Sequence, residues 1–194
     1  MDVYKVGELE LRIAQIISSL GLDLNDPNLK DTPQRIQKMM KEELFSSIGK
    51  ELPQDCTAVF KNEGYDEIIM LDNIPFTSMC AHHFLPFSGL AYLLYIPKYS
   101  IIGASKPARM IEFYCKKPQI QEQLGIDIMN GFISIVQPLG AMLVMRATHS
   151  CMSCRGAKTG LNAGMTTCIT RGTFRNNQEL EMKGLQLIQI FKEK

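Results

Sequence analysis

The sequence lacks several features that would assign it to a common functional class. It contains no run of about 18 uncharged apolar residues, so we expect no membrane span. Its formal net charge of +1 provides no basic surface for nucleic acid or for an anionic membrane. Neither G-x-x-x-x-G-K-[ST] nor G-x-G-x-x-G occurs, so the common phosphate-binding loops are absent. Charges at Asp2, Lys5 and Glu8 argue against a signal peptide, and we expect a cytoplasmic protein.

Size and composition are those of a globular domain that needs no cross-links. The chain has 194 residues, of which 45% are hydrophobic and 21% charged. A chain of this length buries roughly 70% of its unfolded surface, which is enough for a stable core. We therefore expect the six cysteines to be reduced and free for metal binding or packing.

Hydrophobic periodicity predicts helices at the start of the chain. Apolar residues recur at helical spacing from Leu9 to Leu20, and Gly21 follows as a stop signal. A second helix is predicted at Asp31-Thr32-Pro33, with Thr32 as the N-cap and Pro33 at the first helical position. We expect residues 1–50 to form an N-terminal helical segment.

The rest of the chain, residues 51–194, has the pattern of an α+β domain. Short apolar runs bounded by glycine and proline predict strands, and longer periodic segments predict helices. The order is two strands, two helices and two strands, which favours a mainly antiparallel sheet. The predicted strands are 67–74, 89–97, 141–151 and 165–174, and the predicted helices are 105–116 and 118–137.

All three histidines lie within three residues of a cysteine. Cys80-x-x-His83 has the spacing by which two side chains in one turn reach a single Zn²⁺ ion, and thiolate and imidazole are preferred zinc ligands. His149 and Cys151 are two apart at the end of a predicted strand, so both should project from the same face. Cys80, His83 and Cys151 would together leave the fourth metal position to water, as in catalytic zinc sites.

A closed structural site is the alternative reading of the same residues. Cys151-Met-Ser-Cys154 is a C-x-x-C motif, and with Cys80 and His83 it would complete a Cys₃His site. Such a site has no use for two further imidazoles, those of His82 and His149. An open site needs groups of this kind as acid and base, and we therefore favour it.

Two further segments could bind an anion and a purine base. A helix that begins near Ser105 would present free N–H groups, with Lys106 and Arg109 on one side of its first turn. Arg155 adds a guanidinium four residues after Cys151. A solvated basic face is the simpler alternative for this group.

Gln121-Glu122 begins the next predicted helix. A glutamate can accept from the two adjacent N–H groups of guanine, which adenine lacks, although most helical glutamates are simply solvated.

Taken together, these motifs resemble the GTP cyclohydrolase I family. The resemblance includes "SMCAHHFLPFSG", "IIGASKPARMIEF", "KKPQIQEQL" and "ATHSCMSCRG" and extends from about residue 10 to the C-terminus in the family's order. It implies that Cys80, His83 and Cys151 bind Zn²⁺ and that His82 and His149 transfer protons. It also implies two groups of substrate-binding residues. The triphosphate would be held by Ser105, Lys106, Arg109 and Arg155. The guanine edge would be recognised by Gln121 and Glu122.

The resemblance further implies an activity and an assembly. The expected reaction is zinc-dependent hydrolysis of GTP to 7,8-dihydroneopterin triphosphate and formate, the first step of pterin and folate biosynthesis. The expected fold is the tunnelling fold: an antiparallel sheet with two helices on one face, an N-terminal helical extension, and a catalytic domain over residues 51–194. Similar members are barrel-like homodecamers of two pentamers with active sites between subunits.

The sequence departs from the family at Ala81, where a glutamate is usual, and it has a cysteine at position 154. Loss of the carboxylate could change how the neighbouring imidazoles are oriented. Two alternatives therefore stay open. The first is a related hydrolase that opens the purine ring and stops early, and the second is a non-catalytic, zinc-stabilised assembly protein.

Overall fold

The computed structural model describes residues 7–160 and 163–192 of the chain. The chain divides into two compact units, Met1–Ile48 and Gly49–Lys194. Within the described residues, no helix combines the length and the apolar character needed to cross a membrane.

The N-terminal unit contains the two helices that the sequence predicted. Helix α1 (Glu8–Ser19) buries Ile13 and Ile17, and Gly21 after it adopts a φ of 79°. Helix α2 (Thr32–Lys38) continues as a π-helical turn, η1 (Met39–Leu44). The expected N-cap was one residue late: Asp31 is the N-cap, because its carbonyl accepts the N–H of Arg35 and Thr32 is already helical.

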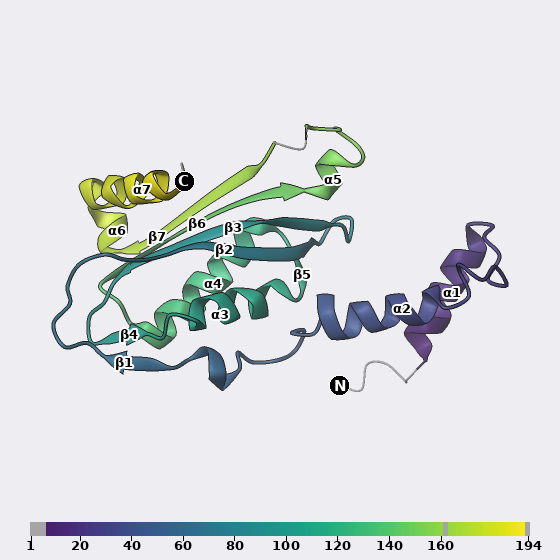
Figure 1. The fold of residues 1–194 in the computed structure, drawn as a ribbon, viewed down its shortest axis with the longest axis horizontal. Helices are drawn as coiled ribbons and strands as arrows, with labels where there is room; N and C mark the ends of the chain where they lie inside the picture. The colour runs from purple at the N-terminus through teal and green to yellow at the C-terminus, as the bar shows by residue number, and fades with distance from the viewer. Residues whose placement is uncertain (1–6, 161–162, 193–194) are drawn as a thin grey trace. The chain divides into compact units, whose positions relative to one another are not determined.

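A mainly antiparallel sheet of five strands is the centre of the second unit (Figure 1). Its order is β5-β2-β3-β6-β7, and β5 is the strand that pairs in parallel, with the end of β2. The four predicted strands are present, whereas the short β5 and a separate β1-β4 pair were not predicted. The strands are β1 (Val59–Lys61), β2 (Ile69–Cys80), β3 (Pro86–Ile96), β4 (Ser100–Ile102), β5 (Pro118–Gln119), β6 (Gly140–His149) and β7 (Met165–Gly172).

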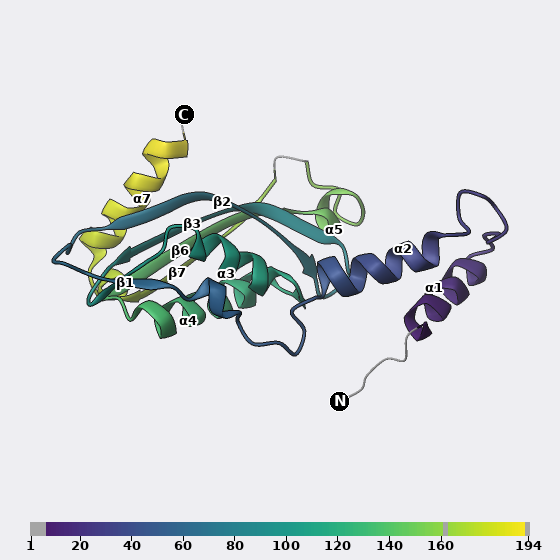
Figure 2. The ribbon, with the colours of Figure 1, turned by 60° about the horizontal axis from the view of Figure 1, so that its bottom comes forward.

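Helices cover both faces of this curled sheet (Figures 1 and 2). Helices α3 (Lys106–Cys115) and α4 (Gln121–Val136) cover one face, in agreement with the two helices predicted from sequence. The short α6 (Thr173–Asn176) and α7 (Gln178–Lys192) pack on the other face, and neither was predicted. A 3-10 turn, η2 (Gln54–Cys56), precedes β1.

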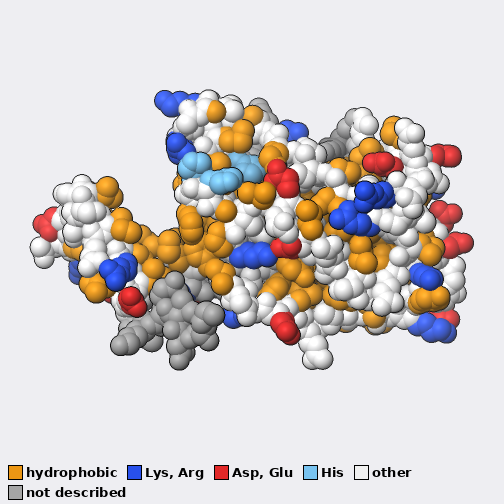
Figure 3. Space-filling model, turned by 180° about the vertical axis from the view of Figure 1, so that it is seen from behind, with side chains coloured by type: hydrophobic (Ala, Val, Ile, Leu, Met, Phe, Trp, Pro, Cys, Tyr) orange, Lys and Arg blue, Asp and Glu red, His pale blue; other side chains and the backbone are white. Residues whose placement is uncertain are grey.

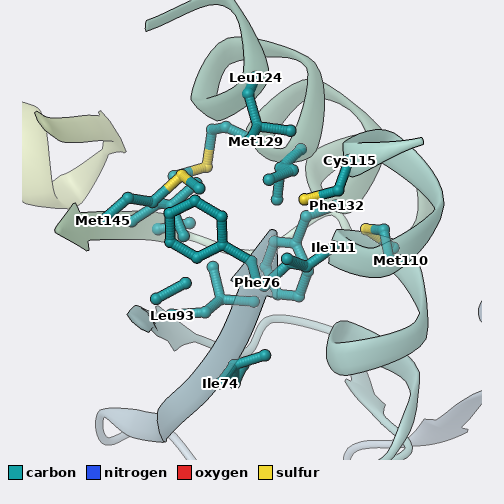
Figure 4. Close-up of a cluster of buried hydrophobic side chains, with 14 of the residues drawn as sticks. Ile74, Phe76, Leu93, Met110, Ile111, Cys115, Leu124, Met129, Phe132 and Met145 are labelled. Atoms are coloured by element: carbon teal, nitrogen blue, oxygen red, sulfur yellow. The ribbon is translucent and has the colours of Figure 1, made fainter. Parts of the chain in front are cut away.

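Alternate residues of the central strands therefore face two separate cores. The odd-numbered residues of β3 and β6, such as Leu93 and Met145, contact α3 and α4 in the larger core, where Phe132 is also fully buried (Figure 4). The even-numbered residues, such as Tyr92 and Met142, pack in the smaller core with residues of α6 and α7. This alternation decides which side of the sheet each site residue occupies.

Candidate functional site

The first cysteine of the site ends a strand and opens a tight turn. Cys80 is the last residue of β2 and is 5% exposed. Its N–H donates to the carbonyl of Leu85 (2.9 Å), and its carbonyl accepts the N–H of Phe84 (2.9 Å). Between these bonds His82 and His83 are exposed, so the turn presents both imidazoles outward from the sheet.

The second cysteine lies in a helical turn. Strand β6 ends at His149, and Cys151 belongs to α5 (Ser150–Ser153), which is closed by the Cys154 N–H on the Ser150 carbonyl at 3.0 Å. The prediction that His149 and Cys151 share a face through strand alternation was therefore wrong in its reason. The turn of α5, and not the pleat of a strand, orients the Cys151 thiol.

Cys80, His83 and Cys151 nevertheless form one cluster, whose ligand atoms all lie within 4.8 Å of one another. The two sulfur atoms are 3.9 Å apart. Tetrahedral zinc with Zn–S bonds of about 2.3 Å requires sulfur atoms about 3.8 Å apart, so this donor set fits Zn²⁺. Cys154 is exposed and is not part of the cluster, so the described residues provide three ligands and not the four of a closed site.

Burial and the neighbouring Cys80 both raise the pKa of the Cys151 thiol. Its pKa is raised by burial, by the hydrogen bond to Cys80 and by the charge of Cys80, while Arg155 acts in the opposite direction. Arg155 itself is exposed, two residues after the end of α5.

His82 lies directly beside the cluster. Its Nδ1 is 3.8 Å from the Cys80 sulfur, and its ring meets that of His83 edge to face, with centroids 6.3 Å apart. Figure 3 shows histidine side chains gathered in one area of the surface, next to apolar side chains. The proximity of His82 to this candidate metal cluster is what a proton-transfer role would require.

His149 is held in place on two sides. Phe87, its cross-strand partner in β3, stacks on the imidazole with centroids 4.6 Å apart and an interplanar angle of 2°. The His149 Nε2 lies 2.9 Å from Oε1 of Gln121. Burial lowers the pKa of His149, and the charge of Glu122 opposes that shift. Sequence reasoning missed Phe87, which only the strand register places against His149.

Gln121 and Glu122, adjacent in sequence, occupy different environments. The Gln121 side chain is 1% exposed, and its Nε2 donates to acceptors within the sheet. Glu122 is exposed, yet close enough to His149 to affect its pKa. Glu122 is therefore the member of the pair whose polar group is accessible to a ligand.

The expected anion-binding residues form a separate group at the start of α3. Ser105 is the N-cap, although its side chain makes no capping hydrogen bond, and Lys106 is the first helical residue. Arg109 pairs with Asp55 of η2, Nη1 to Oδ2 at 2.6 Å. This hydrogen bond to the guanidinium lowers the pKa of the Asp55 carboxyl. Asp55 was not identified from the sequence, where no local signal joins it to Arg109.

The two groups are associated with opposite ends of α3. Helix α3 has ten residues and ends at Cys115, from which the chain passes to β5 beside Cys80. At 1.5 Å per residue, the helix separates Lys106 from that end by about 15 Å. None of Ser105, Lys106 and Arg109 hydrogen-bonds or pairs with the metal-cluster side chains within the described part of the chain.

Comparison with known proteins identifies the family. The sequence model of "GTP cyclohydrolase I" matches residues 9–189. The GTP cyclohydrolase 1 of Streptococcus pneumoniae serotype 19F (strain G54) is 37% identical over 188 residues, which cover 97% of this chain and 99% of that protein. The chain belongs to the GTP cyclohydrolase I family. This membership makes it an enzyme that acts on GTP and confirms the resemblance seen in the sequence.

One further relative and one solved structure are also similar to this chain. The GTP cyclohydrolase 1 of Streptococcus mutans serotype c (strain ATCC 700610 / UA159) is 35% identical over 182 residues, 93% of each chain. A crystal structure of the archaeosine synthase QueF-Like in the apo form aligns with a TM-score of 0.46 and 14% identity, over 57% of this chain and 97% of that one.

Proposed function

We propose that this protein hydrolyses GTP to 7,8-dihydroneopterin triphosphate and formate. The observation that carries the proposal is the cluster of Cys80, His83 and Cys151, with His82 beside it and His149 at the N-cap of the α5 turn that carries Cys151. These residues lie within a chain of the GTP cyclohydrolase I family. Three ligands leave a coordination position free for chemistry, which distinguishes this arrangement from a closed structural site.

In the proposed site, Cys80, His83 and Cys151 hold Zn²⁺. When bound, zinc supplies Lewis-acid activation of water for attack on C8 of guanine. His149 donates a proton to N7 of the purine as the imidazole ring opens, because it is the histidine with a fixed ring orientation. His82, next to Cys80, is the second proton-transfer group.

Substrate recognition is proposed to use residues around this centre. Glu122 accepts from the adjacent N–H groups of guanine, which is consistent with its exposure near His149. Ser105, Lys106 and Arg109 at the α3 N-terminus hold the triphosphate, where free N–H groups and the helix dipole favour an anion. Arg155, which is exposed four residues after Cys151, adds a further guanidinium to the triphosphate site.

We also propose that complete sites form between copies of this chain in a barrel-like homodecamer. The separation of about 15 Å between the start of α3 and its end near Cys80 supports this arrangement. A substrate at the metal cluster of one copy would then take the contacts of Ser105, Lys106 and Arg109 from a neighbour and that of Arg155 from the same copy. We assign the N-terminal helical segment, residues 1–50, a role in contacts between subunits. Sedimentation of the purified protein tests the number of subunits in the oligomer.

The decisive experiment is incubation of zinc-loaded protein with GTP. Formate release and the absorbance of a dihydropterin are followed together, in wild type and in His149→Ala. We expect both signals in wild type and neither in the variant. Formate without a dihydropterin would show that the reaction stops early and would point to Ala81. No turnover by a protein that retains zinc would refute the proposed activity.

A further inference from the structure

We infer that Gln121 is a positioning residue that holds His149 as a donor at Nε2, so that Nδ1 is the nitrogen that exchanges a proton with the substrate. This inference rests on the proposed function for its catalytic meaning. It replaces the expectation that the Gln121 side chain reads the guanine edge. The hydrogen bonds around Gln121 lead to it in two steps.

The amide of Gln121 can adopt only one orientation. Its side chain is 1% exposed at the start of α4. Nε2 lies 3.1 Å from the carbonyl oxygen of Met145, 3.2 Å from that of Met165 and 3.2 Å from Oγ1 of Thr167. Rotating the amide by half a turn would place Oε1 against two carbonyl oxygens, which cannot donate. The network therefore assigns Oε1 to the side that faces His149.

This orientation determines where His149 carries its hydrogen. Oε1 of an amide only accepts, so the Nε2 of His149, 2.9 Å away, must be protonated. Phe87, stacked at 4.6 Å, keeps the imidazole in the plane that this bond requires. No other hydrogen bond to the His149 ring is found among residues 7–160 and 163–192, so Nδ1 is the nitrogen left for a substrate.

The proton balance of the step follows from this assignment. The imidazolium gives its Nδ1 proton to N7 of the purine and becomes the neutral ring that retains Nε2–H. Gln121 Oε1 accepts the same hydrogen bond before and after the transfer, so the ring does not reorient during the step. With Gln121 removed, the neutral ring would divide between its two tautomers, and only one presents a free Nδ1.

The direct test is nitrogen NMR of zinc-loaded protein with isotope-labelled histidine. The chain has three histidines, and the signals of His149 are identified by their loss in His149→Gln. We expect neutral His149 in wild type to be the Nε2–H tautomer alone. In Gln121→Met we expect a mixture of tautomers, together with a fall in kcat of roughly 10²-fold and little change in KM for GTP.

Gln119→Met is the matched control. Gln119 is 6% exposed, and its Nε2 also has three acceptors, which are Ser78 Oγ and the carbonyls of Tyr114 and Lys117. The control therefore loses a similar set of buried hydrogen bonds without contact to a histidine ring. We expect it to keep the wild-type tautomer of His149, which separates positioning from a general loss of packing.

Three results would overturn the inference. One is an Nδ1–H tautomer for neutral His149 in wild type, which needs no variant to fold. Another is an unchanged tautomer and kcat in Gln121→Met. The third is a rise in KM for GTP at unchanged kcat, which would return Gln121 to base recognition. Failure of wild type to turn over GTP would instead refute the proposed function, and the tautomer would still decide the role of Gln121.

Discussion

Replacing Phe87 by leucine should separate the stability of the fold from the orientation of His149, the proposed proton donor. Phe87 is fully buried, stacks on His149 and meets Phe76 edge to face at 6.3 Å. Truncation to alanine would cost about 3–5 kcal/mol, a large part of the roughly 5–15 kcal/mol by which domains are stable. Leucine retains most of the volume and should cost only about 1–1.5 kcal/mol in the free energy of unfolding.

The rate effect is calculated from the lost stacking. Aromatic pairs contribute roughly 0.5–1.5 kcal/mol beyond the area they bury. If that energy holds the imidazole in its reactive orientation, Phe87→Leu should lower kcat by roughly two- to tenfold. The expected loss is in kcat, because Phe87 is not available to contact GTP.

Phe132→Leu is the matched control for this measurement. Phe132 is also fully buried in the larger core and meets Tyr95 edge to face at 5.2 Å. Urea unfolding should give similar losses of stability for the two variants, and GTP turnover should fall only in Phe87→Leu. Equal falls in kcat, or none in Phe87→Leu at unchanged zinc content, would refute the argument that stacking orients His149.

Three further experiments test zinc retention, phosphate binding and cysteine burial. Cys154→Ala should retain zinc after dialysis and Cys151→Ala should lose it, as measured by atomic absorption; loss in both would indicate a closed site. Asp55→Asn should lower the KM for GTP a few fold, most at low salt, because it frees Arg109; an unchanged KM would mean that Arg109 does not bind phosphate. Burial raises the pKa of Cys115 to about 12, so alkylation followed by mass spectrometry should modify the exposed Cys154 and spare Cys115; a modified Cys115 would contradict its burial.

The elements with strong local patterns were predictable from sequence. Helices α1, α3 and α4 have apolar residues at helical spacing, and the four long strands are apolar runs bounded by turns. The clustering of Cys80, His83 and Cys151 was also predictable, because Cys80-x-x-His83 is a local spacing and Cys151 belongs to a motif that carries its own histidine.

What the sequence could not predict depends on contacts between distant segments. Strand β5 has two residues and pairs with Met79 and Cys80, which are distant from it in sequence. The pairing of Asp55 with Arg109 joins residues 54 positions apart. Gln121 is the first residue of a helix, a position that is usually exposed, and it is buried because the sheet supplies acceptors for its amide.

The side of the sheet on which Cys80 lies is set by an irregularity in β2. The register shifts between Leu71 and Ile74, where β2 has one residue more than β3, and Asn73 adopts a φ of 50°. Before the shift Leu71 packs against the larger core, whereas after it the even-numbered residues Ile74, Phe76 and Cys80 belong to that core.

Side chains alternate strictly between the faces of a sheet, so one extra residue moves every later side chain to the opposite face. Without the bulge at Asn73, Cys80 would face the core that contains α7, while His149 and Phe87 would stay on the α4 face. Cys80 and His149 therefore lie on the same side of the sheet because of a bulge at Asn73, seven residues before the end of β2 at Cys80. The bulge is held by the hydrogen bond from Tyr92 Oη to Asn73 Oδ1 at 3.1 Å. The chemistry of this site depends on backbone register as much as on the identity of its ligands.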